Sequence, residues 1–288
     1  MLLLYFWILI QIIIESLPIS SSGHVALIQK LFSKFGYSPD LFADAWIVDF
    51  VLHGPTIAIL LIYFFKPWWN MVFHQSHIDF KIFLKKSTWL TLIQPLMFVS
   101  IADIITVIFW ACGIAENIFI SRYFLPIGFM ITASALYTTR LRDSLHSLTT
   151  PRQAPGKLLK GDDIWNFTNA IILGIVQGLS LLPGISRFAS TYSAARFLCH
   201  YDNSTSFALS FLIQLPLIGA GFLKGLIALQ KYPELMAKLF ALPTLLVMVI
   251  ASFISYGLLC LVGVMIQKNT LYYFAFYMII PIIISLIL

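Results

Sequence analysis

Long apolar segments separated by short polar stretches fill most of this chain of 288 residues. A transmembrane helix needs about 20 apolar residues, and a transmembrane β-strand would show short segments of alternating polarity instead. The apolar runs here are long and continuous, so the pattern predicts an all-α polytopic membrane protein. The predicted segments are 1–28, 45–65, 87–111, 118–139, 165–200, 204–229, 239–266 and 270–288.

Composition agrees with this prediction. Hydrophobic residues make up 60% of the chain and charged residues only 10%, whereas a soluble domain carries about 25% charged residues. The net charge of +6 does not indicate a nucleic-acid partner, because positive loops of polytopic proteins serve as topology signals and contact anionic membrane lipids. The Lys/Arg excess of the predicted loops 66–86 and 140–163 places both loops in the cytoplasm.

Two of the apolar segments contain similar polar motifs, at 11–24 and at 177–191. Each motif starts with Gln, reaches a Pro six or seven residues later, and then presents hydroxyl groups beside a His or an Arg. Pro and Gly break helices at membrane depth, where broken backbone is tolerated only if it is buried in protein or lines a cavity. We therefore expect both motifs to face a functional site.

The motifs lie near the starts of the two halves of the chain, which suggests an internal duplication. Interrupted hydrophobic segments in corresponding positions of two halves are typical of inverted repeats around a midplane site. The sequence thus predicts a single membrane domain over 1–288, built as an inverted-repeat helical bundle with re-entrant helix hairpins. The two pseudo-repeats would span roughly 1–140 and 160–288.

The first motif offers a carboxylate and an amide oxygen. Gln11 and Glu15 are four residues apart and share one helix face, where they could bind a hard divalent cation together with phosphate oxygens and water. The alternative is that Glu15 hydrogen-bonds the broken helix. We favour the functional role, because an unpaired carboxylate among isoleucines has no inexpensive structural explanation.

Hydroxyl groups and a histidine follow Pro18. Ser20, Ser21 and Ser22 stand near the start of the next helix, where hydroxyls and free N–H groups suit an anion. His24 is three residues beyond Ser21, so it could serve as base to a serine nucleophile. A serine-rich helix cap followed by an incidental histidine is the alternative.

The second motif is the stronger anion site. Gly184 lets backbone approach a ligand, and Arg187 offers a planar fork that matches phosphate oxygens. Ser186 precedes this arginine, and Thr191, four residues beyond it, could add a hydroxyl to the same anion. The alternative is an ion pair between Arg187 and Glu15.

Two further acidic residues lie in apolar segments. Asp49 forms an i, i+4 pair with His53, for which both a structural and a functional role stay open. Asp103 is isolated within an apolar run, and we expect it to pair helices.

At these motifs the chain resembles the undecaprenyl-diphosphate phosphatase family, the bacitracin-resistance type of membrane phosphatase. That family's first motif is Glu-x-x-x-Glu followed by Pro-x-Ser-Ser-(Thr/Ser)-Gly-His, and its second is Pro-Gly-x-Ser-Arg-Ser-x-x-Thr. Here the motifs span 11–24 and 183–191. Similar segments at 49–54, 128–130, 174–179 and 210–216 extend the resemblance over about 8–221.

The resemblance implies hydrolysis of a C55 polyprenyl diphosphate to the monophosphate, with Mg²⁺ or Ca²⁺ as cofactor. Such a hydrolase recycles the carrier lipid of peptidoglycan synthesis in the bacterial inner membrane and is connected with antibiotic resistance. It implies catalytic roles for Glu15, Ser21, His24 and Arg187, and metal ligation by Glu15 with Gln11. Substrate contacts are expected from Ser20, Ser22, Gly184, Ser186, Thr191 and His53.

Two departures from the family pattern concern the site. Gln11 replaces a glutamate and removes one negative charge, and Phe188 replaces a serine, which is expected to add bulk beside the phosphate site. These departures leave two alternatives open: a transporter or flippase for polyprenyl phosphate, and a catalytically weakened lipid-binding relative. The oligomeric state, including a homodimer, stays open as well.

Overall fold

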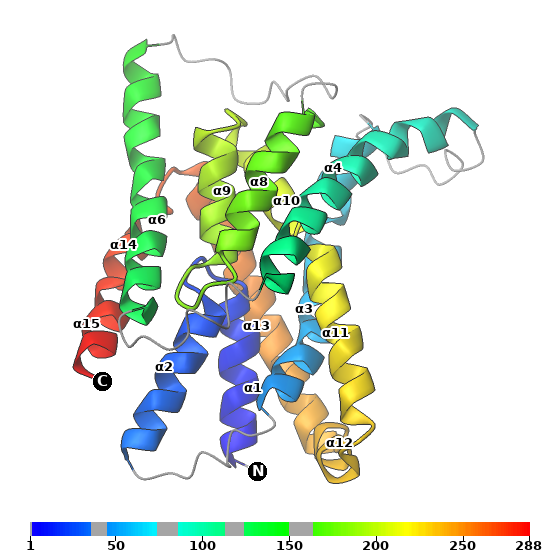
Figure 1. The fold of residues 1–288 in the computed structure, drawn as a ribbon, viewed down its shortest axis with the longest axis vertical. Helices are drawn as coiled ribbons and strands as arrows, with labels where there is room; N and C mark the ends of the chain where they lie inside the picture. The colour runs from blue at the N-terminus through cyan, green and yellow to red at the C-terminus, as the bar shows by residue number, and fades with distance from the viewer. Residues whose placement is uncertain (1, 36–44, 74–85, 113–123, 150–163) are drawn as a thin grey trace.

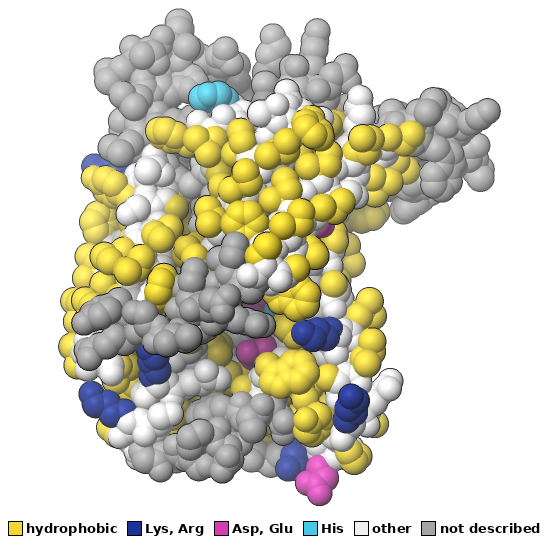
Figure 2. Space-filling model, viewed as in Figure 1, with side chains coloured by type: hydrophobic (Ala, Val, Ile, Leu, Met, Phe, Trp, Pro, Cys, Tyr) yellow, Lys and Arg dark blue, Asp and Glu magenta, His cyan; other side chains and the backbone are white. Residues whose placement is uncertain are grey.

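The protein is a bundle of α-helices (Figure 1). The computed structural model describes residues 2–35, 45–73, 86–112, 124–149 and 164–288, and this part of the chain contains no β-strand. The all-α prediction is confirmed. Large apolar side chains cover much of the surface shown in Figure 2, as expected for a protein that faces lipid.

The helices pack in pairs that are distant in sequence. Helix α3 (Ala45–Phe73) runs along α11 (Leu215–Leu229), and α4 (Lys86–Ala111) along α8 (Phe167–Leu179). Helix α1 (Leu2–Glu15) packs against α13 (Leu242–Gln267). The other helices of the described residues are α2 (Ser21–Lys34), α6 (Phe124–Thr149), α9 (Arg187–Phe197), α10 (Asn203–Leu212), α12 (Pro233–Leu239), α14 (Tyr273–Tyr277) and α15 (Ile279–Ile287).

Among the described residues, four helical segments are long and apolar enough to cross a membrane: 45–73, 92–111, 203–229 and 242–267. By contrast, α1 and α2 have 14 residues each, and α8 and α9 have 13 and 11. At about 1.5 Å per residue, none of these four helices reaches the roughly 30 Å of a hydrocarbon core. Both polar motifs therefore lie between two short helices, and their re-entrant placement in the membrane stays a prediction.

The breaks follow from local sequence. Pro18 lacks an N–H and disfavours helical backbone in the residue before it, so α1 ends at Glu15 and α2 begins only at Ser21. Pro183 and Gly184 separate α8 from α9 in the same way. Each motif thus places its polar residues at helix ends, where backbone groups are free to bind a ligand.

Two helices extend further than the hydropathy pattern predicts. Helix α3 continues to Phe73 and α6 to Thr149, into the predicted loops 66–86 and 140–163. The extra turns of α3 are amphipathic, and Trp68 and Trp69 within them are buried. The helix ends that flank these loops lie at the upper end of Figure 1, which agrees with the prediction that both loops share one side. The rest of each loop lies outside the described residues.

A cluster of aromatic side chains forms part of the core between α3, α9 and α10. Phe64 stacks on Trp68 with ring centroids 5.3 Å apart, and Phe211 lies 5.2 Å from Phe64. The Trp68 indole N–H donates to the carbonyl of Ala208 at 2.9 Å, which satisfies its buried polar atom. Phe188 of α9 packs on the same Phe211 with ring centroids 4.7 Å apart. The cluster therefore fixes α9, which follows the second motif's loop, through α10 against the long span α3.

Candidate active site

Three glycines bring the two motifs into direct contact. We call Gly23 on α2, Gly128 on α6 and Gly184 between α8 and α9 the glycine junction. A Cβ atom on Gly23 would lie 2.7 Å from the Cα of Gly184, and one on Gly128 would lie 2.1 Å from the carbonyl oxygen of Pro183. Only glycine permits so close an approach of backbones. The first and second motifs therefore face each other, as the sequence predicts.

Unusual backbone conformations accompany this contact. Gly184 has a φ of +85°, which favours glycine, and Ser20 has a φ of +65° although it carries a side chain. Ser20 is the N-cap of α2, and its hydroxyl accepts the N–H of Gly23 at 3.2 Å. Non-glycine residues in this region are strained and are concentrated at functional sites. The strain at Ser20 therefore supports a functional role of the first motif.

Thr132 on α6 holds the loop before Arg187. Its hydroxyl donates to the carbonyl of Gly184 and accepts the N–H of Ser186, both at 2.8 Å. The Ser186 hydroxyl in turn caps α9 by accepting the N–H of Ala189 at 3.2 Å. Arg187 is thus the first residue of a helix whose start is fixed by three hydrogen bonds.

Arg187 is well placed to bind an anion. Its Nε is buried and has no hydrogen-bond partner within the described residues, where no carboxylate forms a close ion pair with it. Its charge interacts at longer range with Glu15 and Asp103. Pairing with Glu15, the structural alternative, is therefore not a direct ion pair. A desolvated guanidinium without a close partner is costly, and a bound phosphate would offset that cost.

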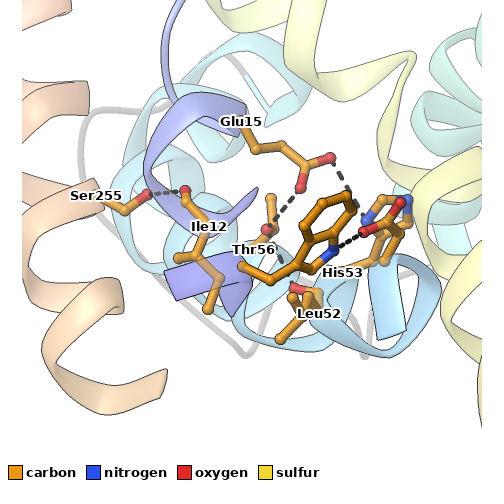
Figure 3. Close-up of polar contacts among 8 residues, drawn as sticks. Ile12, Glu15, Leu52, His53, Thr56 and Ser255 are labelled. Atoms are coloured by element: carbon orange, nitrogen blue, oxygen red, sulfur yellow. Dashed lines mark hydrogen bonds and ion pairs between the residues drawn. The ribbon is translucent and has the colours of Figure 1, made fainter. Parts of the chain in front are cut away.

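Glu15 ends α1 and is held between two residues of α3 (Figure 3). One carboxylate oxygen lies 3.5 Å from Nδ1 of His53, and the other accepts the Thr56 hydroxyl at 3.2 Å. Both ionisable side chains are only 14% exposed. Asp49, one turn before His53, accepts the indole N–H of Trp7 at 2.7 Å. The structure thus brings His53 into the site beside Glu15. Asp49 instead links α3 to α1 through its hydrogen bond with Trp7.

The end of α1 is braced by α13. The Ser255 hydroxyl donates to the carbonyl of Ile12 at 3.0 Å (Figure 3). It also contacts the Ser16 hydroxyl. The Ile12 carbonyl belongs to the last turn of α1, where intrahelical partners are missing. This bracing keeps Glu15 in a fixed position at a helix end.

His24 has partners at both ring nitrogens. Nδ1 lies 2.8 Å from the carbonyl oxygen of Ser20 and therefore carries the proton, and Nε2 lies 3.1 Å from the hydroxyl of Tyr277. The expected hydrogen bond from Ser21 to His24 is not among those of the described residues. Ser21 is partly exposed at the start of α2, and the exposed Ser22 lies 3.5 Å from the Ser20 hydroxyl.

Two residues of the second motif differ from expectation. The buried Thr191 donates its hydroxyl to the carbonyl of Arg187 at 2.7 Å, so this proton stabilises α9 and does not point to an anion. Phe188 is only 3% exposed, and its ring packs 4.7 Å from Phe211 and 5.6 Å from Phe207. The expected bulk beside the phosphate site is therefore absorbed by the aromatic core.

Three residues of this region were not predicted as site residues, namely Thr56, Thr132 and Tyr277, and the structure also gives partners to Gln177 at the start of the second motif. The Gln177 amide donates to the Asp103 carboxylate at 3.0 Å and to the Thr106 hydroxyl at 3.2 Å. Asp103 thus pairs α4 with α8, as predicted, and its charge also acts on Arg187. The spacing of Asp49, His53 and Thr56 on one helix face could have identified Thr56.

A divalent cation fits the oxygen atoms of the first motif. The Gln11 amide oxygen is buried and has no hydrogen-bond partner within the described residues, and Glu15 follows one turn later. The described residues form no cluster of three or more His, Cys, Asp or Glu. Mg²⁺ typically takes one or two carboxylates together with substrate phosphates and water. The donor set is therefore compatible with a cation that phosphate oxygens help to bind.

Fold and site together define an integral membrane protein with a buried polar centre suited to a phosphate-bearing ligand. Comparison with known proteins identifies the family. The model of the bacitracin resistance protein BacA matches residues 6–284, and the chain belongs to that family. The predicted resemblance is confirmed.

Three relatives match nearly the full chain. A protein of Borrelia hermsii named undecaprenyl-diphosphatase is 30% identical, with 94% of this chain and 92% of the relative covered. Undecaprenyl-diphosphatase 2 of Bacillus thuringiensis is 28% identical, with 97% and 94% covered. The undecaprenyl-diphosphatase of Desulfosudis oleivorans is 29% identical, with 93% and 91% covered.

Proposed function

We propose that this protein hydrolyses undecaprenyl diphosphate to undecaprenyl phosphate and inorganic phosphate, and so recycles the carrier lipid of cell-wall synthesis. Its membership of the BacA family and its undecaprenyl-diphosphatase relatives support this activity. The geometric observation that carries it is the glycine junction, which brings the carboxylate motif and the arginine motif together. The apolar helices support a place in a membrane, and we propose the bacterial inner membrane.

In this proposal Arg187 binds the terminal phosphate. Its guanidinium lacks a close carboxylate within the described residues, and a planar fork can contact two phosphate oxygens at once. Negative charge spreads over the equatorial oxygens of the phosphoryl group during transfer. A fixed cation at this position therefore stabilises the transition state more than the ground state.

The reaction forms a new P–O bond at the terminal phosphorus and breaks the bridging P–O bond to the lipid phosphate. The attacking oxygen comes from Ser21, followed by hydrolysis of the phosphoserine, or directly from water. In either case the attacking O–H loses its proton and the lipid phosphate leaves as the oxyanion. The backbone carbonyl of Ser20 accepts the Nδ1–H of His24, which leaves Nε2 as the basic nitrogen. Nε2 would accept the proton after exchanging its contact with Tyr277.

Glu15 and Gln11 would hold the divalent cation, Mg²⁺ or Ca²⁺. When bound, the cation neutralises phosphate charge and polarises the phosphoryl oxygens. Thr56 and His53 hold the two carboxylate oxygens of Glu15 in place. They would preserve the orientation of this ligand as the charge around it changes.

Phosphate release from farnesyl diphosphate by purified protein in detergent with Mg²⁺ tests the proposal. Arg187→Ala should abolish the activity, and Arg187→Lys should restore little of it, because a lysine lacks the planar fork. Lys30→Ala removes an exposed positive charge away from the site and is the matched control. It should retain wild-type activity. Binding of the diphosphate without release by the wild type would refute the hydrolase and favour the transporter alternative.

A further inference from the structure

Lys224 is the only charged residue of the apolar helix α11. An ionisable side chain within a membrane-spanning segment is costly and usually marks a functional position. Its ammonium group lies over three aromatic rings: 5.4 Å from the centre of Phe50, 5.5 Å from that of Trp110 and 5.9 Å from that of Trp46. We call these three rings the aromatic cage.

The aromatic cage holds the ammonium without neutralising it. Cation–π attraction fixes a charge over the ring faces, and the described residues provide no carboxylate ion pair to Lys224. The side chain is exposed, so the charge is accessible. A cation held in place but not paired is well suited to attract an anion.

Two contacts place Lys224 next to the candidate active site. Gly221, three residues earlier on α11, packs against His53, since a Cβ on Gly221 would lie 3.1 Å from the His53 ring. Residues three apart share a helix face. The Phe50 ring lies 5.9 Å from the His53 ring and also belongs to the cage. Phe50 therefore lies next to both Lys224 and His53, the partner of Glu15.

The surface view agrees with this arrangement. In Figure 2 a basic side chain lies close to acidic side chains near the middle of the face, among apolar side chains. A lipid that enters from the side would meet the basic side chain with its headgroup and the apolar side chains with its tail.

We propose that Lys224 is an additional substrate-binding residue, which contacts the phosphate groups of the lipid diphosphate at the entrance of the site before they reach Arg187. This proposal rests on the proposed function and deepens it. The aromatic cage keeps the ammonium aimed at the entrance and offers an apolar surface to the first isoprene units. Phosphate groups of bulk anionic phospholipids share this chemistry and are the competing source.

Steady-state kinetics with farnesyl diphosphate in non-ionic detergent test the charge. Lys224→Met keeps the apolar stem but removes the ammonium. We expect its KM to rise about tenfold, as for loss of one charge-assisted contact, with little change in kcat. Lys224→Arg should retain most of the affinity. Lys231→Met, at an exposed position just beyond α11, is the matched control and should leave both constants unchanged.

Salt and lipid separate the two phosphate sources. The KM of the wild type should rise with ionic strength more steeply than that of Lys224→Met, because salt screens an exposed charge. If Lys224→Met keeps the wild-type KM and loses only its thermal stabilisation by phosphatidylglycerol, Lys224 binds bulk lipid and the proposal is overturned. Equal defects in the Met and Arg variants would also overturn it, because charge would then not be the cause.

A binding measurement separates this proposal from the hydrolase itself. Trp46 and Trp110 lie at the ammonium, so inorganic pyrophosphate that binds Lys224 should change tryptophan fluorescence. The change should vanish in Lys224→Met and persist in Lys231→Met. A wild type that binds pyrophosphate in this way but releases no phosphate would refute the hydrolase and keep the entrance site. A fluorescence change that survives in Lys224→Met would exclude Lys224 as the binding residue.

Discussion

Gly128→Ala should damage the site through backbone displacement alone. The new Cβ would lie 2.1 Å from the Pro183 carbonyl oxygen and 2.9 Å from the Gly184 Cα. Both neighbours are backbone atoms, so no side-chain rotation can relieve the clash. The loop before Arg187 must move by about 1 Å, at a cost of about 1–3 kcal/mol, the usual range for overpacking.

Activity should fall more than stability. A displacement of about 1 Å at a catalytic group can reduce the rate about 100-fold, and Arg187 follows the displaced loop directly. The stability loss is smaller, because alanine is favoured over glycine in a helix by about 1 kcal/mol. We therefore expect a phosphate-release rate near 1% of wild type in protein that still folds.

Gly219→Ala is the matched control. It also lies within a helix, but nothing lies within 4 Å of its added Cβ, so it should leave activity unchanged and stability equal or slightly higher. The assay is phosphate release from farnesyl diphosphate, together with thermal unfolding in detergent. If Gly128→Ala is as active and as stable as Gly219→Ala, the glycine junction does not position the second motif, and the reasoning fails.

Further predictions concern charge, packing and the cation. Gln11→Glu should lower the Mg²⁺ concentration needed for half-maximal activity several-fold, since divalent-cation affinity follows the number of charged ligands; an unchanged requirement in a metal titration would remove Gln11 from the metal site. Phe188→Ser should not raise activity but should destabilise the protein by about 3–5 kcal/mol, because it opens a cavity in the aromatic core; a thermal unfolding temperature equal to that of wild type would contradict this. Thr56→Val should lower kcat with little effect on folding, because Glu15 loses one of its two partners; the Thr56→Ser variant should recover most of kcat. Removal of divalent cations with EDTA should abolish phosphate release and Mg²⁺ should restore it; full activity in EDTA would exclude the proposed cofactor.

Much of the site could be predicted because its chemistry is concentrated in two short segments. Pro18 and Gly184 break helices for local reasons, and Glu15 and Arg187 stand out in apolar surroundings. Their position at helix ends follows from features that lie close together in sequence, whereas only the similarity of the two motifs pointed to a shared site, and their contact depends on packing between distant helices. The all-α fold is likewise predictable from the length of the apolar runs.

The partners of these residues depend on packing between distant segments. Tyr277 meets His24 across 253 positions of the chain, and no local pattern marks that pairing. The orientation of Phe188 was likewise not predictable, because the rings that receive it belong to α10. Helix ends were underestimated where amphipathic turns continue a span, as in α3 at Trp68 and Trp69.

The hydrogen bond between His24 and Tyr277 bears on how the protein is made. A ribosome synthesises His24 early, but the phenol that holds its Nε2 follows only after 253 further positions. The bond can therefore form only after Tyr277 has been synthesised and has packed beside α2. Nascent chains released before Tyr277 would therefore carry both motifs yet leave the imidazole without this restraint.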